Sequence, residues 1–219
     1  MEKDNKRDMI SRRIAAELKD GDYCNLGIGL PTGVANHIPP GITVYFQSEN
    51  GILGAGPKPE PGMEEADLIN AGGGPITAIP GASYFDSFWS FSMIRGGHVD
   101  MTVLGALQVD QEGSIANWMI PGKVVPGIGG AMDLVSGAKQ VVAAMEHMDK
   151  YGNSKIMKKC NLPLTGYRVL TLIVTDMAAM RITPEGLLLV DLAEGVSLDD
   201  VIKATDADLI IPDNVGTFN

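Results

Sequence analysis

The sequence predicts an α/β fold in which parallel strands are separated by helices and loops. Residues 4–19 have apolar side chains at helical spacing with charges between them, which is typical of an amphipathic helix. The short apolar stretch 23–26 follows as a strand, a glycine turn comes next, and Pro31 can begin another helix. Residues 42–46 are β-branched and aromatic and form the next predicted strand. Because open α/β sheets bind ligands at the carboxyl ends of their strands, we expect functional residues directly after these strands.

A polar stretch follows the predicted strand 42–46, and it reads Gln47-Ser48-Glu49-Asn50-Gly51. A carboxylate at the end of a buried strand is costly unless it is hydrogen-bonded or used, so Glu49 is a candidate functional residue. Residues 52–57 are small and predict a loop, and their glycines would let a ligand approach the backbone. Turns rich in Ser, Asn and Gly are common, however, so a polar turn that only ends the strand is the alternative.

The turn after strand 23–26 is a second candidate site. Gly27, Gly29 and Gly33 form a G-x-G-x-x-x-G pattern between a strand and a helix start, which is the outline of a phosphate-binding turn. The pattern misses the dinucleotide-binding spacing by one residue. Close packing of the backbone at this turn is the alternative, and the spacing does not decide between the two.

The segment that follows is predicted to be mostly irregular. Residues 55–63 are rich in proline and glycine and indicate a loop, whose length suggests a flap over the site. Residues 77–79 predict a short strand that ends at Pro80. Aromatic side chains gather in residues 84–89. We interpret them as a packed wall, with a contact to adenine or an acyl group as the alternative.

Residues 99–109 predict an internal strand that is interrupted only by a glycine. Arg95, which precedes it, can hold a carboxylate or a phosphate, although a structural ion pair is the favoured interpretation. His37, His98 and His147 lie in contexts without the spacing of a catalytic triad or a metal site. The sequence therefore predicts no metal centre.

A glycine-rich stretch, residues 121–130, leads into the next element. Gly129 and Gly130 directly precede Ala131, and adjacent glycines with free amides can form an anion-binding nest. A simple turn is the alternative. The residues that follow, 139–146, fit a strand or a helix equally well.

The last third of the chain alternates between strands and turns. Residues 167–175 and 179–182 predict strands, and a turn with proline and glycine connects the latter to residues 187–192 as a hairpin. A capping box begins a helix over residues 197–204. Residues 209–211 are expected to end the ordered chain, and the residues after them are expected to fray.

The composition predicts one globular domain, residues 1–219, with 45% hydrophobic and 20% charged residues. The net charge of −10 argues against a nucleic-acid surface. No apolar run approaches the roughly 20 residues that span a membrane, and the N-terminus lacks the pattern of a signal or transit peptide. Cys24 and Cys160 have no metal-type spacing and indicate reduced thiols. We therefore expect a cytoplasmic protein.

Eight short segments carry a resemblance to one protein family. One segment is Ser48-Glu49-Asn50-Gly51-Ile52-Leu53-Gly54, and the others are residues 27–32, 67–72, 94–100, 104–109, 116–123, 129–135 and 162–166. In this order they resemble class I CoA-transferases, in the β subunits of 3-oxoacid CoA-transferases, and residues 48–54 resemble the active-site signature of that family. The resemblance extends over roughly residues 10–210.

The resemblance implies a CoA-transferase-like fold, with an open, mainly parallel sheet and flanking helices, and it implies roles for particular residues. Glu49 matches the family's covalent nucleophile. Gly129, Gly130 and Ala131 belong to a loop that lines the active site in the family, so their amides are candidates for oxyanion binding. Gly27 and Gly29 are further candidates for substrate binding. Coenzyme A would be a substrate, and no cofactor is expected.

The same resemblance implies a partner, because the family's Gly-x-Gly-Gly-Phe segment, carried by the α subunit or the N-terminal half, is absent from this chain. A homologous α subunit should complete the enzyme, often as an α2β2 heterotetramer. The substrates would be a short-chain acyl-CoA and a 3-oxoacid such as acetoacetate. An acyl-CoA hydrolase on the same scaffold and a non-enzymatic metabolite sensor are the alternative functions.

Overall fold

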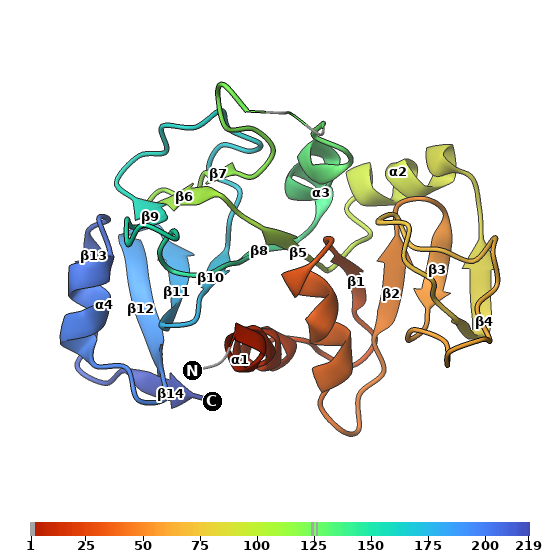
Figure 1. Cartoon of the computed structure of the whole chain (residues 1–219), viewed down its shortest axis with the longest axis horizontal. Coiled ribbons are helices and arrows are strands. Elements are labelled where there is room, and N and C mark those ends of the chain that lie inside the picture. The colour runs from red at the N-terminus through yellow and green to blue at the C-terminus, as the bar shows by residue number, and fades with distance from the viewer. Residues whose placement is uncertain (1–2, 124, 126) are drawn as a thin grey trace.

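The structure is a computed structural model that describes residues 3–123, 125 and 127–219. Its main feature is an 11-stranded sheet that runs through the molecule (Figure 1). In chain order, its strands are β1 (Tyr23–Leu26), β2 (Tyr45–Ser48), β3 (Ile52–Ala55), β4 (Ala78–Tyr84), β5 (Met101–Gly105), β8 (Gln140–Ala144), β10 (Leu172–Val174), β11 (Ala178–Thr183), β12 (Gly186–Ala193), β13 (Leu209–Ile210) and β14 (Gly216–Phe218).

The centre of this sheet is parallel, antiparallel pairs follow on both sides of it, and the outer pairs of β12 with β13 and with β14 are again parallel. The spatial order is β13-β12-β11-β10-β8-β5-β1-β2-β3-β4, and β14 also pairs with β12. The pairs β10–β8, β8–β5, β5–β1 and β1–β2 are parallel, whereas β2–β3, β3–β4, β10–β11 and β11–β12 are antiparallel. The prediction of an open, mainly parallel sheet is confirmed.

Helices cover both faces of the sheet. They are α1 (Lys3–Ala15), the 3₁₀ helix η1 (Leu30–His37), α2 (Ser87–Arg95), α3 (Ala131–Gly137) and α4 (Leu198–Ala204). Figure 1 shows α2 and α3 above the central strands and α1 below them. A smaller sheet has the order β7-β6-β9 and consists of β6 (Gln108–Asp110), β7 (Ile115–Ala116) and β9 (Ile156–Met157).

The strand period of two divides the core into two clusters. Along β8, Val141 and Ala143 pack into the cluster that contains Ile94 of α2, whereas Val142 and Ala144 pack into the cluster of α1. Successive side chains of a strand point to opposite faces, so a strand covered on both faces is apolar throughout. The apolar pattern of residues 139–146 fits a strand or a helix equally well. Burial on both faces explains why it forms strand β8 over Gln140–Ala144.

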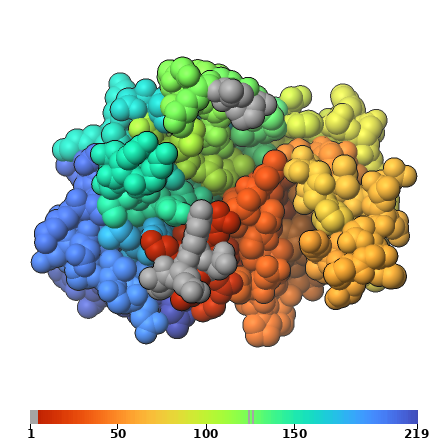
Figure 2. Space-filling model, viewed as in Figure 1, coloured from red at the N-terminus to blue at the C-terminus, as the bar shows by residue number. Residues whose placement is uncertain are grey.

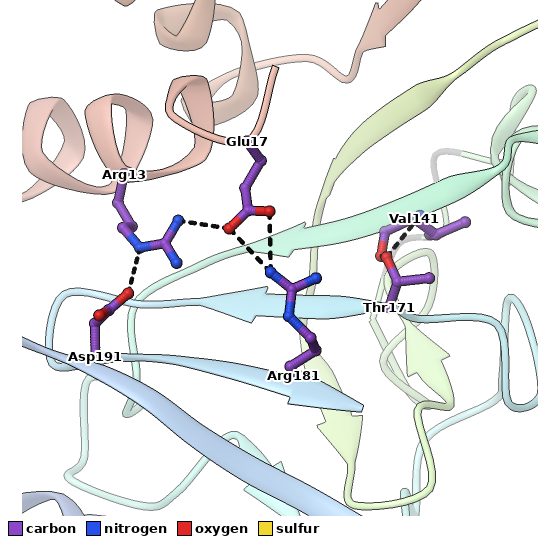
Figure 3. A network of polar contacts seen from close by, with 6 residues as sticks. All are labelled: Arg13, Glu17, Val141, Thr171, Arg181 and Asp191. Carbon is purple, nitrogen blue, oxygen red and sulfur yellow. Dashed lines mark hydrogen bonds and ion pairs between the residues drawn. The ribbon is translucent and has the colours of Figure 1, made fainter. Parts of the chain in front are cut away.

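Ion pairs attach α1 and the residues after it to the antiparallel flank (Figure 3). Arg13 Nη1 lies 2.8 Å from Glu17 Oε1, and Arg13 Nε lies 2.8 Å from Asp191 Oδ2 on β12. Arg181 of β11 donates to both oxygens of Glu17 at 3.0–3.1 Å. The network joins the N-terminal helical segment to the β11–β12 hairpin, which lies more than 160 residues further along the chain.

Several predicted boundaries are wrong near the candidate site. The helix predicted over residues 4–19 ends at Ala15, and the strand predicted over 42–46 lies at Tyr45–Ser48. The small-residue stretch 52–57 is not a loop throughout, because β3 forms a hairpin with β2. Strand β4 runs through Pro80. Proline has no N–H to donate, and it is tolerated here because β4 is an edge strand whose register with β3 shifts between Ala78 and Ser83.

Two other predictions are wrong, one for the aromatic stretch at residues 84–89 and one for the C-terminus. Tyr84, Phe88 and Trp89 are 64%, 71% and 61% exposed, so they do not form a packed wall in this chain. The C-terminal residues do not fray, since β14 pairs with β12 and Phe218 packs against the core. The predicted hairpin at β11–β12 and the capping box of α4 are confirmed.

The space-filling view shows an elongated molecule (Figure 2). The orange and yellow segment that carries β2 to β4 forms one end, and the blue C-terminal segment forms the other. None of the helices that the structure describes is both long and apolar enough to cross a membrane.

Candidate active site

Glu49 lies at the carboxyl end of β2, in the short turn that leads to β3. The amide of Gly51 donates to Ser48 O at 3.0 Å, and the amide of Phe85 donates to Gly51 O at 3.0 Å. Gly51 has φ of 127°, and a Cβ atom there would collide with the carbonyl of Phe85. A side chain at this position is therefore excluded, and the glycine is required to place Glu49 on a tight turn.

The register of the parallel strands brings Asn25 to Glu49. Asn25 of β1 is the partner of Gln47 on β2, and side chains two residues apart on a strand share a face. Asn25 Nδ2 donates to Glu49 Oε2 at 3.1 Å. Asn25 is 1% exposed, whereas Glu49 is half-buried at the edge of the sheet. The carboxylate is thus held from the core side and open on the other.

The glycine loop before α3 reaches the same carboxylate. A Cβ atom at Gly130 would lie 3.6 Å from Glu49 Cγ and 3.2 Å from the ring of Phe91. Gly129 adopts φ of 56°, and Gly130 is the N-terminal cap residue of α3. The amides of Gly129 and Gly130 donate to no acceptor within the described part of the chain, and Ala131 N has only a long contact of 3.4 Å to Ile128 O. Glu49 and Gly130 are therefore brought together, while oxyanion binding by these amides remains a prediction.

The turn at Gly27 and Gly29 lies beside this site. The amide of Gly27 donates to Val103 O at 2.8 Å, and a Cβ atom at Gly27 would lie 3.0 Å from the same oxygen. Close packing of β1 against β5 therefore accounts for Gly27. Gly29 has φ of 89° and open space around its Cβ position. The backbone conformation, and not packing, therefore favours a glycine at this position. A role of either glycine in substrate binding remains a prediction.

Two neighbours of Glu49 hold the next loop in place. Ser48 Oγ accepts from the amide of Ala71 at 3.0 Å, and Asn50 Nδ2 donates to Ile69 O at 2.7 Å. The loop then passes over the glycine turn, because a Cβ atom at Gly72 would lie 3.0 Å from the side chain of Ile28. The sequence did not indicate this function of Ser48 and Asn50. A flap function of the proline-rich loop remains a prediction.

The other polar candidates have structural partners. Arg95 Nε lies 2.7 Å from Asp133 Oδ1, as the ion-pair interpretation predicted. His147 is buried between the hydroxyls of Thr175 and Thr205, each 2.9 Å away, and burial lowers its pKa to about 4. In the described ranges, no group of three or more Asp, Glu, His or Cys residues could hold a metal ion.

The fold and this site define an α/β protein whose candidate reactive group is a carboxylate at the edge of a parallel sheet. Residues 7–204 match the model of the coenzyme A transferase family. The chain belongs to the coenzyme A transferase family and is of its β-subunit type.

Two bacterial relatives are similar over nearly their whole length. One is a subunit of the probable succinyl-CoA:3-ketoacid coenzyme A transferase of Bacillus subtilis, which is 52% identical over 209 residues that cover 95% of this chain and 97% of that protein. The other is the β subunit of the acetate CoA-transferase of Escherichia coli, which is 52% identical over 198 residues that cover 90% of each chain.

A solved structure supports the fold. The acyl-CoA transferase YdiF of Escherichia coli O157:H7 aligns with a TM-score of 0.76 and 20% identity over 98% of this chain, which corresponds to 43% of YdiF. At this identity the likeness shows the fold alone. The chain therefore spans less than half of that longer protein.

Proposed function

We propose that this chain is the β subunit of a 3-oxoacid CoA-transferase, which moves CoA between a short-chain acyl-CoA and an acid such as acetoacetate. One observation carries the proposal: Glu49 stands on a tight hairpin turn at the carboxyl edge of the sheet, between the Asn25 amide and Gly130. The names of the similar proteins, which are 3-ketoacid and acetate CoA-transferase subunits, support the substrate class.

Glu49 acts as the covalent nucleophile in a ping-pong mechanism. Its carboxylate attacks the thioester carbonyl of the acyl-CoA. The C–S bond then breaks, CoA departs as a thiolate, and a mixed anhydride of Glu49 and the acyl group remains. The thiolate then attacks the carbonyl carbon of Glu49, which releases the first acid and leaves a glutamyl-CoA thioester. A second carboxylate reverses these steps and departs as its CoA ester.

Each step passes through a tetrahedral oxyanion that needs hydrogen-bond donors. Backbone amides of Gly129, Gly130 or Ala131 serve this purpose in the proposal, because Gly130 borders the Glu49 side chain. Water has to be excluded as well, since it would hydrolyse the anhydride. In the proposal, the loop that Ser48 and Asn50 hold beside Glu49 contributes to this exclusion.

Catalysis requires a homologous α subunit, in an assembly that we expect to be α2β2. The similar bacterial proteins are named as single subunits of their enzymes, and this chain lacks the Gly-x-Gly-Gly-Phe segment. A cytoplasmic location remains a prediction of the sequence.

The test is to assay this chain alone and with its cognate α subunit, using a matrix of acyl-CoA donors and carboxylic acids. We expect negligible transfer by the isolated chain and acid-dependent transfer by the complex. Release of free CoA at the full rate without an acceptor acid would identify a hydrolase instead. Binding of acyl-CoA without turnover of either kind would support the sensor.

A further inference from the structure

A row of buried polar side chains crosses the sheet beneath α2 and ends at Glu49. Asn25 of β1 and Gln47 of β2 are only 1% and 4% exposed, and Ser90 of α2 is fully buried. Gln47 Nε2 donates to Ser90 Oγ at 2.7 Å, and Asn25 Nδ2 donates to Gln47 Oε1 at 2.7 Å. The same Nδ2 atom donates to Glu49 Oε2. The row therefore links the helix to the carboxylate.

The chemistry of the partners fixes the orientation of the Asn25 amide. Its NH₂ group has two hydrogens and faces three acceptors, so two of them share one hydrogen: Gln47 Oε1 at 2.7 Å, the backbone carbonyl of Gln47 at 3.2 Å and the carboxylate of Glu49 at 3.1 Å. A carbonyl and a carboxylate only accept hydrogen bonds, so the NH₂ group has to point at them. Gln47 must then present its oxygen to Asn25 and its NH₂ group to Ser90.

This orientation leaves an unsatisfied atom in the core. Asn25 Oδ1 is buried and has no hydrogen-bond partner among the residues described. Thr102, the register partner of Asn25 on β5, likewise has a buried Oγ1 without a partner in the described part of the chain. An unsatisfied buried group costs roughly 1–3 kcal/mol. The Asn25 amide therefore destabilises the fold at its Oδ1 atom while its Nδ2 atom donates to Glu49. This combination indicates a function beyond stability.

We propose, building on the proposed function, that Asn25 is a catalytic residue that holds Oε2 of Glu49, and that Gln47 and Ser90 are positioning residues that keep its amide there. With Oε2 held, Oε1 forms the bond to the acyl carbon while the C–S bond breaks. When the CoA thiolate attacks the Glu49 carbonyl carbon, the electron pair of that carbonyl collects on Oε2, next to the Asn25 donor. The bond from the Glu49 carbonyl carbon to Oε1 then breaks, and the first acid leaves with that oxygen.

The experiment uses the complex of this chain with its α subunit. Single-turnover mixing with acyl-CoA and no acceptor acid measures release of the first acid, and borohydride reduction shows that the glutamyl thioester has formed. Asn25→Ala should slow this step by about 100- to 1,000-fold, the usual effect of losing one oxyanion donor. Ser90→Ala and Gln47→Met should each slow it by about 10-fold, because a displaced donor loses part of this effect.

Two further readouts separate positioning from a structural function. The KM for acyl-CoA should change less than about twofold in the Ser90 and Gln47 variants, since only a transition-state interaction is lost. The double variant Ser90→Ala/Gln47→Met should be no slower than either single variant, because both substitutions break the same chain of hydrogen bonds to Asn25.

The matched control is Ser92→Ala, which removes another hydroxyl of α2 that donates to Phe88 O at 2.7 Å and lies outside the row. It should behave as the parent complex. Gln47→Met is close in shape to the native residue, so it tests the row if Ser90→Ala does not fold. Parent rates of acid release in folded Asn25 and Gln47 variants would overturn the proposal. A parent complex that forms no glutamyl thioester would instead refute the proposed function.

Discussion

Glu17 and Glu49 are two partly buried glutamates of the same chain in opposite surroundings. Glu17 is held by the guanidinium groups of Arg13 and Arg181 (Figure 3). Burial raises the pKa of Glu17, but the hydrogen bonds from Arg13 and Arg181 outweigh this effect and hold the pKa below its ordinary value. Glu49 takes part in no ion pair between described residues and accepts from the neutral amide of Asn25.

In the proposed mechanism, the difference separates a structural carboxylate, Glu17, from a reactive one, Glu49. Two cations on a carboxylate stabilise its charge and occupy its lone pairs, which suits the attachment of a helix to a sheet. A neutral donor orients the carboxylate while it leaves the charge and one oxygen available for attack. The comparison predicts that changes at Glu49 affect turnover, whereas changes at Glu17 affect stability.

The largest effect is expected at Glu49. Glu49→Ala should abolish CoA transfer by the complex, because no other group can form the acyl intermediate, while the free energy of unfolding and assembly with the α subunit should be nearly unchanged. Steady-state assays and denaturant unfolding of the same preparations measure both quantities. Glu49→Asp should also be severely impaired, since a carboxylate displaced by about 1 Å can lose roughly 100-fold in rate. An active Glu49→Ala complex would remove the distinction between the two glutamates.

The next effect is expected at Gly130, where a side chain would enter the space between the ring of Phe91 and Glu49. Gly130→Val should lower kcat by about 100-fold through displacement of the carboxylate. Gly130→Ala adds a single methyl group and should lie between the parent and the valine variant. Thermal unfolding should change far less than turnover. Folded variants with the parent's turnover would assign the glycine pair to a simple turn.

Glu17→Gln should give the converse result. At pH 7 it should lower the free energy of unfolding by about 2 kcal/mol, the order expected for lost hydrogen bonds to charged groups, with kcat unchanged. A carboxyl group whose folded pKa is lowered contributes stability above its unfolded pKa and loses it as the pH falls through the folded pKa. The parent should therefore lose this contribution below about pH 4.5, the ordinary glutamate value, and the variant should not. Urea unfolding at pH 7 and pH 4 provides the measurement, and equal losses at both pH values would contradict the assignment.

The smallest effect is expected at Thr102, whose buried hydroxyl has no partner in the described ranges. Thr102→Val keeps the shape and removes the unsatisfied atom, so the free energy of unfolding should stay the same or rise by about 1 kcal/mol. Differential scanning calorimetry can detect the change. A clear loss of stability would show that the hydroxyl is satisfied, for example by buried water.

The sequence predicted the parallel core, the hairpin at β11–β12 and the helix cap at Ser197, because each depends on a local pattern. It did not predict the path of β4 through Pro80 or the pairing of β14, which depend on the position of a strand at an edge or beside a distant partner.

The site was predictable only in part. Spacing alone left Glu49 in a polar turn, and the resemblance to a family singled it out. Asn25, Gln47 and Ser90 meet across 22 and 43 residues of sequence, and no local pattern marks such a contact. The register of β1 and β2 is what brings the first two together.

The central claim is that Glu49 carries the CoA during transfer, and covalent trapping tests it most directly. The complex is mixed with acyl-CoA without an acceptor acid and then treated with borohydride, which reduces a glutamyl thioester to an alcohol. Peptide mass analysis should find this reduction at Glu49 and at no other carboxylate, including Glu17. Reduction at a different residue, or none in an actively transferring complex, would contradict the account.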